Sequence, residues 1–114
     1  MNLLDTGVVI DNIEKNNYFP ALISTITLVE VLRGIEDKKR WSAKQLLEES
    51  FSILNLDNSI IEAYCCIYRT LKEEGNLIPD AYLLIAATAI GHELTLETKD
   101  THFYRLKALG LKLK

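Results

Sequence analysis

Four acidic residues of this chain stand beside apolar runs and could together bind a metal ion. Asp5 follows NLL, Glu30 lies within TLVEVL, Asp80 precedes AYLLIAATAI, and Asp100 follows LTLETK. Carboxylate oxygens are the ligands that Mg²⁺ and Mn²⁺ prefer, and sites of this kind hydrolyse phosphodiesters. The four segments therefore predict a hydrolytic metal site.

Each acid also has a purely structural interpretation. Asp5, Asp80 and Asp100 each stand where a helix is about to begin, so each could be an N-cap. Glu30 could lie on an exposed helix face and pair with Arg33. His102 is expected to be a rim residue in the first turn of a helix rather than a general base. A single acid is weak evidence, but four acids on one pattern favour the metal site.

The hydrophobic pattern predicts short strands that alternate with helices. Strands are expected at 2–4, 21–24, 94–97 and 111–113, and residues 53–56 form either a strand or an extended connection. Helices are expected at about 6–15, 26–36, 40–51, 58–74, 80–91 and 101–108. This alternation predicts a parallel sheet covered by helices on both faces.

The same pattern places the acids. Ligands of parallel sheets bind beyond the carboxyl ends of the strands, and Asp5 and Asp100 fall there. Glu30, one turn into the helix after the second strand, can lean over the same edge. Helix 80–91 is apolar nearly all round and should be central and buried.

Helical spacing gives two further predictions about side-chain burial. The helix at 40–51 is expected to present Trp41, Leu46, Leu47 and Phe51 as its apolar face. The adjacent residues Cys65 and Cys66 point about 100° apart on a helix, so they are expected to be buried, reduced thiols rather than a disulfide.

Length and composition predict one globular domain spanning residues 1–114. The chain has 114 residues, of which 48% are apolar and 25% are charged. Its net charge of −3 argues against a protein that coats nucleic acid by electrostatics alone. No apolar run reaches the length of a membrane span and no signal peptide is evident, so a cytoplasmic protein is expected.

Four segments resemble the PIN domain family, and within it the VapC-type toxins of prokaryotic toxin–antitoxin pairs. They are LLDTGVVID, ISTITLVEVLRG, IPDAYLLIAATAIGHELTLETKDTHF and LKALGLKL. The resemblance implies a three-layer α/β/α fold around a mostly parallel sheet of four to five strands. It also implies an Mg²⁺- or Mn²⁺-dependent endoribonuclease that acts on RNA, forms homodimers, and is inhibited by a small VapB-like antitoxin whose C-terminal tail enters the site.

The resemblance also assigns roles to residues. Asp5, Glu30 and Asp100 match three acids of the family, and Asp5 and Asp100 would bind one or two metal ions with Glu30 as a ligand or a hydrogen-bond partner. Family members often read IPDADLLIAATA, whereas this chain has Tyr82 at the position of the second acid. Asp80, which is also a candidate catalytic residue, is two residues away, about 200° round a helix, and could take over the same direction only if the helix began later than residue 80. The resemblance therefore predicts an impaired nuclease, in which Tyr82 is either natural or a change selected during cloning.

Two other classes remain open at this point. A non-enzymatic PIN-fold module that only holds an antitoxin or a dimer mate would also explain Tyr82. A phospho-receiver domain would need an acceptor such as Asp57, which follows ILNL, and a lysine at a later strand end, for which only Lys99 is available. The pair Asp57–Asn58 is more typical of a helix cap.

Overall fold

Five short strands form the centre of the molecule. The computed structural model describes residues 1–114 and orders the strands β3-β2-β1-β4-β5. The strands are β1 (Leu3–Leu4), β2 (Leu22–Ser24), β3 (Ser52–Leu54), β4 (Thr95–Glu97) and β5 (Lys112–Leu113). Every neighbouring pair is parallel, which confirms the predicted α/β fold and makes residues 52–54 a strand rather than a connection.

Strand β1 lies in the middle of the sheet. Leu3 is in register with Leu22 of β2 and with Leu96 of β4. The ladder extends one residue further, because the Asp5 amide donates to the Glu97 carbonyl at 3.1 Å. The ends of β1 and β4 are therefore held side by side.

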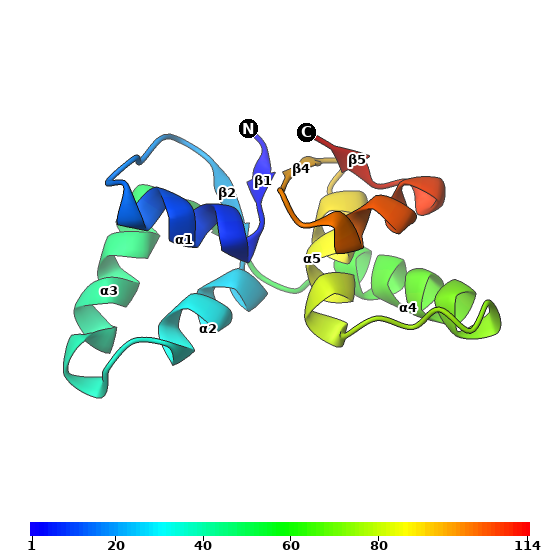
Figure 1. Cartoon of the computed structure of the whole chain (residues 1–114), viewed down its shortest axis with the longest axis horizontal. Helices are drawn as coiled ribbons and strands as arrows, with labels where there is room; N and C mark the ends of the chain where they lie inside the picture. The colour runs from blue at the N-terminus through cyan, green and yellow to red at the C-terminus, as the bar shows by residue number, and fades with distance from the viewer.

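Six helices cover the two faces of the sheet. They are α1 (Thr6–Glu14), α2 (Thr25–Arg33), α3 (Asp37–Ser50), α4 (Asn58–Glu73), α5 (Asp80–Gly91) and the 3₁₀-helix η1 (Thr101–Leu109). Figure 1 shows α1, α2 and α3 gathered on one side of the strands, with α4, α5 and η1 on the other. None of these helices is both long enough and apolar enough to cross a membrane.

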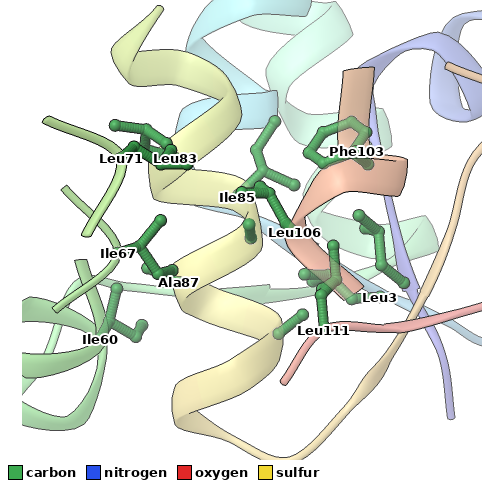
Figure 2. Close-up of a cluster of buried hydrophobic side chains, with 13 residues drawn as sticks. Leu3, Ile60, Ile67, Leu71, Leu83, Ile85, Ala87, Phe103, Leu106 and Leu111 are labelled. Carbon is green, nitrogen blue, oxygen red and sulfur yellow. The ribbon is translucent and has the colours of Figure 1, made fainter. Parts of the chain in front are cut away.

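The alternation of side chains along β1 divides the interior into two cores. Leu4 is buried with residues of α1, α2 and α3, including Val9, Leu32 and Leu47. Leu3 points to the opposite face and is buried with residues of α4, α5 and η1 (Figure 2). Helix α5 is central, as predicted, since six of its residues are buried: Leu83, Ile85, Ala86, Ala87, Thr88 and Ala89.

Helix α5 packs closely on the start of α4. A Cβ atom added at Gly91 would lie 2.9 Å from the Ser59 carbonyl oxygen. The Asp57 carboxylate caps α4 by accepting from the Ile60 amide at 3.0 Å, and its other oxygen lies 2.7 Å from His92 Nε2. Asp57 follows the edge strand β3 rather than a central one, which contradicts the phospho-receiver alternative.

Two predictions about buried surface are wrong. Cys65 and Cys66 are free, as expected, but both are exposed. The buried side of α4 consists of Ile60, Ile67 and Leu71, at helical spacing, and both cysteines point away from that stripe.

Helix α3 likewise buries less than its sequence suggests. Leu47 and Phe51 are in the core, whereas Trp41 is 70% exposed and Leu46 is 45% exposed. The helix begins three residues earlier than predicted, at Asp37, and touches the sheet only near its C-terminal end, so its first half projects into solvent.

Candidate active site

The candidate site lies where the strand order reverses. Strands β1 to β3 extend to one side and β4 to β5 extend to the other, so the ends of β1 and β4 flank the reversal point at which open α/β sheets bind ligands. Asp5 follows β1 and Asp100 follows β4. A pocket of about 340 Å³ opens here, and Asp5, Glu30, Asp100, Tyr82 and Arg33 are among its lining residues.

Asp5 serves both as a helix cap and as a wall of the pocket. Its side chain is 5% exposed, its Oδ1 accepts from the Val8 amide at 2.8 Å, and the buried Thr98 hydroxyl donates to its Oδ2. Burial raises the pKa of the Asp5 carboxyl because it removes water from the charged form, and the negative charges of Asp100 and Glu30 add to this effect. The hydrogen bonds from Thr98 and Val8 oppose the rise in pKa without cancelling it.

Glu30 reaches the same pocket from α2. Its Oε1 accepts from the Thr6 hydroxyl at 2.6 Å, which ties it to the first residue of α1. Its Oε2 lies 3.5 Å from the Arg33 guanidinium. The predicted pairing with Arg33 is therefore present, yet it does not place Glu30 on a fully exposed face, because the Glu30 side chain is only 19% exposed.

Asp100 caps η1 and is surrounded by donors. Its Oδ1 accepts from the His102 amide at 3.0 Å and lies 2.7 Å from His102 Nδ1. Its Oδ2 accepts from the Tyr82 hydroxyl at 3.0 Å. Burial opposes ionisation of Asp100, but the hydrogen bonds from His102 and Tyr82 outweigh it and lower the pKa of this carboxyl.

Tyr82 occupies the position at which the resemblance places an acid. Its ring centroid lies 5.0 Å from that of the exposed His102 and 5.3 Å from that of Phe103. The hydrogen bond to Asp100 raises the pKa of the Tyr82 phenol, so the group stays protonated and acts as a donor. The pocket therefore holds a neutral hydroxyl where a fourth negative charge is expected.

Asp80 is not brought to the pocket. Pro79 occupies the N-cap position of α5, and Asp80 is the first residue of the helix with no capping hydrogen bond, so the N-cap prediction is wrong. The exposed Asp80 carboxylate accepts from the Tyr64 hydroxyl of α4 at 2.7 Å, and this bond raises the pKa of Tyr64 to about 12. The structure thus places Asp80 against α4, while Asp5, Glu30 and Asp100 line the pocket together.

The donor atoms of the acids in the pocket are of the type that a hard divalent cation prefers. They offer only oxygen donors, and Asp5 already carries the electrostatic cost of facing two other carboxylates, which a cation would relieve. No three acidic, histidine or cysteine side chains are gathered closely enough to form a complete ligand set as they stand. Each carboxylate is instead held by a neighbouring hydrogen-bond donor.

Sequence reasoning missed two of these donors, Thr98 and Thr6. Thr98 also binds the next acid, because its Oγ accepts from the Asp100 amide at 2.9 Å. The available signal was its place two residues before Asp100 and directly after a strand. Thr6 directly follows Asp5 and gave a similar signal for Glu30.

The chain resembles known proteins in sequence and in fold. The PIN domain family model matches residues 3–109. Ribonuclease VapC1 of Methanocaldococcus jannaschii is 44% identical over 97% of this chain and 85% of its own length. VapBC-1 from nontypeable Haemophilus influenzae has the same fold, with a TM-score of 0.82 at 22% identity over 99% of this chain and 96% of that chain. A toxin–antitoxin complex from Klebsiella pneumoniae gives a TM-score of 0.67 at 29% identity over 89% of this chain and 88% of that chain.

Proposed function

Because the chain belongs to the PIN domain family, we propose that it is a metal-dependent endoribonuclease toxin whose activity is impaired by Tyr82. The relative that is 44% identical is named a ribonuclease and covers nearly the whole chain. The pocket at the reversal point of the sheet supplies three carboxylates of the type that phosphodiester hydrolysis requires.

The cation proposed for this site is Mg²⁺ or Mn²⁺. Asp5 and Asp100 would hold it, with Glu30 as a third ligand or a hydrogen-bond partner, since hard cations select carboxylate oxygens. When bound, the cation stabilises negative charge on the phosphate and lowers the pKa of the attacking water.

The neighbouring residues prepare the carboxylates for this role. Thr98 and the Val8 amide fix both oxygens of Asp5, so its plane is set before any cation arrives. Thr6 fixes one oxygen of Glu30 in the same way. Ligands oriented by such hydrogen bonds lose little freedom on binding.

The impairment follows from the Tyr82 hydroxyl. It donates to Asp100 Oδ2 at 3.0 Å and so engages an oxygen that a cation would use, while contributing no charge of its own. Mg²⁺ is especially sensitive, because it demands near-ideal octahedral oxygen ligation. This hydrogen bond is the single observation that carries the impairment.

The test is the Tyr82→Asp variant, with Tyr82→Asn as its matched control. Tyr82→Asp should cut single-stranded RNA in Mg²⁺ or Mn²⁺ and lose this activity in EDTA, whereas Tyr82→Asn removes the phenol without restoring the charge and should stay inactive. If the chain with Tyr82 already cuts RNA as well as Tyr82→Asp does, position 82 is not a site position and the impairment is refuted.

A small VapB-like antitoxin is the proposed protein partner. The Klebsiella pneumoniae structure that this chain resembles is a toxin–antitoxin complex, and it matches 89% of the chain. Expression of Tyr82→Asp should therefore arrest growth, and co-expression of a cognate small protein should relieve the arrest.

The alternative function is a binding module without catalysis, and Tyr82 is the observation that favours it. Such a module holds its antitoxin or a second copy of itself through the same fold. For such a module, the Tyr82→Asp variant should cut no RNA in Mn²⁺. It should still bind its antitoxin or a second copy of itself.

A further inference from the structure

Two basic side chains line the two pockets that border the acids. Arg33 lines the pocket described above. Lys99 lines a second pocket, of about 380 Å³, whose wall includes Asp5, Gly7 and Asp100. These three residues also line the first pocket, so the two hollows adjoin over the acids and each carries one cation.

Arg33 is only weakly engaged by its acidic neighbour. Its guanidinium lies 3.5 Å from Glu30 Oε2, longer than the roughly 2.7–2.9 Å of a good charge-assisted hydrogen bond. The Arg33 side chain is 71% exposed, and the other Glu30 oxygen is already held by Thr6. Arg33 can therefore turn toward an incoming anion without leaving Glu30 unpartnered.

Lys99 is also only weakly engaged by its acidic neighbour. Its ammonium lies 3.8 Å from Asp11 Oδ2, and its side chain is 83% exposed. Asp11 has a closer partner in Lys15, at 3.1 Å. The Lys99 cation is therefore surplus to the charge of Asp11, and it stands beside Asp100 in the sequence.

We propose that a single RNA strand crosses the acids from Arg33 to Lys99, with one backbone phosphate bound by each. This path rests on the proposed nuclease function. Three carboxylates repel a polyanion, and the net charge of −3 offers no general attraction, so local cations must hold the strand on both sides of the bond that is cut. A guanidinium suits phosphate oxygens because it binds them with two parallel hydrogen bonds.

The experiment measures binding rather than cleavage. The anisotropy of a short, fluorescein-labelled single-stranded RNA of mixed sequence is followed in EDTA over a KCl series, using the chain with Tyr82, and a gel confirms that the RNA stays intact. Each phosphate contact contributes about −0.7 to the slope of log K against log salt for a single strand. Arg33→Ala and Lys99→Ala should each make the slope shallower by about 0.7, and the double variant by about 1.4.

Two controls separate this path from general charge effects. Lys44→Ala removes an exposed lysine of α3 that lies 3.0 Å from Glu48, and it should leave the slope unchanged. Arg33→Lys keeps the charge and should keep most of the slope. All of these positions are on the surface, so thermal melts should agree with that of the parent chain.

The outcomes distinguish the path from the nuclease function. If the parent binds RNA and both alanine variants bind with the parent slope, the path is wrong, and cleavage by Tyr82→Asp still decides the function independently. If Lys44→Ala lowers the slope as much as Arg33→Ala, the attraction is general and the path is wrong. If the parent does not bind RNA, the path falls whatever Tyr82→Asp does.

Discussion

Replacing Thr98 by valine tests whether hydrogen bonds hold the candidate site together in the absence of a cation. Thr98 is buried, and its hydroxyl makes two bonds: it donates to Asp5 Oδ2 and accepts from the Asp100 amide at 2.9 Å. Valine has nearly the same shape and can make neither bond. Thr98→Ser keeps the hydroxyl and loses only a methyl group, so it is the matched control.

The expected loss has two parts. A hydrogen bond to a charged group contributes about 1.5–3 kcal/mol to the free energy of unfolding, and a neutral one contributes about 1 kcal/mol. Thr98→Val should therefore lower the free energy of unfolding by roughly 3 kcal/mol when Asp5 is ionised. At about 4 °C per kcal/mol for a domain of this size, the melting temperature should fall by about 12 °C.

The charged part of this loss depends on pH. The pKa of Asp5 in the folded protein is raised above its ordinary value of 3.8, so the native state binds more protons than the unfolded state between the two values. The stability contributed by this group therefore falls as the pH rises through that interval. The Thr98 hydroxyl lowers the pKa of Asp5, so valine raises that pKa further and enlarges the fall.

The assay is thermal and urea unfolding in EDTA, at about pH 7 and in acid below the ordinary Asp pKa of 3.8, where Asp5 of the folded protein is protonated because its pKa is raised. Thr98→Val should cost roughly 3 kcal/mol near neutrality and roughly 1 kcal/mol in acid, where a protonated Asp5 no longer needs the donor. Equal losses at the two pH values would refute the reasoning. A loss in Thr98→Ser as large as that in Thr98→Val would also refute it, because the hydroxyl would then not be the cause.

Three other predictions follow from the same structure. Asp5→Asn should weaken Mn²⁺ binding in calorimetry without unfolding the protein in EDTA, because asparagine also caps helices; unchanged Mn²⁺ affinity in Asp5→Asn would rule out a ligand role. Gly91→Ala should cost about 1–3 kcal/mol in urea unfolding, because its Cβ would lie 2.9 Å from the Ser59 carbonyl oxygen. Gly34→Ala is its control, because a Cβ there would lie 3.6 Å from the nearest atom, the Val31 carbonyl oxygen. Equal losses in the free energy of unfolding would show that α4 and α5 are less tightly packed than described. Sedimentation at tens of micromolar should show a homodimer. The exposed side of α3 around Trp41 could form its interface, and a single species of 13.0 kDa would contradict the prediction.

The parts of the fold that were predictable are those decided by neighbouring residues. Leu3 and Leu4 point to opposite faces of the sheet because they are adjacent in a strand, and Asp5 directly follows this buried pair. A strand end fixes where the next side chain goes, so the meeting of Asp5 and Asp100 in one pocket follows from topology.

The parts that were not predictable depend on contacts between distant elements. The orientation of Asp80 is decided by Tyr64 of α4, which no local spacing reveals. The exposure of Cys65 and Trp41 depends on how much of each helix is covered by neighbouring elements. The presence of an apolar residue on a helix does not reveal which side of the helix is covered. Dual roles are also hidden in a sequence: Asp5 both caps α1 and lines the pocket, so the two interpretations were compatible.

The position of β4 beside β1 has a consequence for synthesis of the protein on the ribosome. Thr98 and Asp5 are 93 positions apart, and the bond between them forms only after the segment that carries β4 and η1 has left the ribosome and paired with β1. Until then, Leu4 can already be covered by α1, α2 and α3, so this half of the molecule can begin to fold while Asp100 remains apart from Asp5 and Glu30. A nascent chain thus carries no assembled site during most of its translation. An active nuclease of this fold would therefore be unable to cut the mRNA that encodes it while that mRNA is being translated.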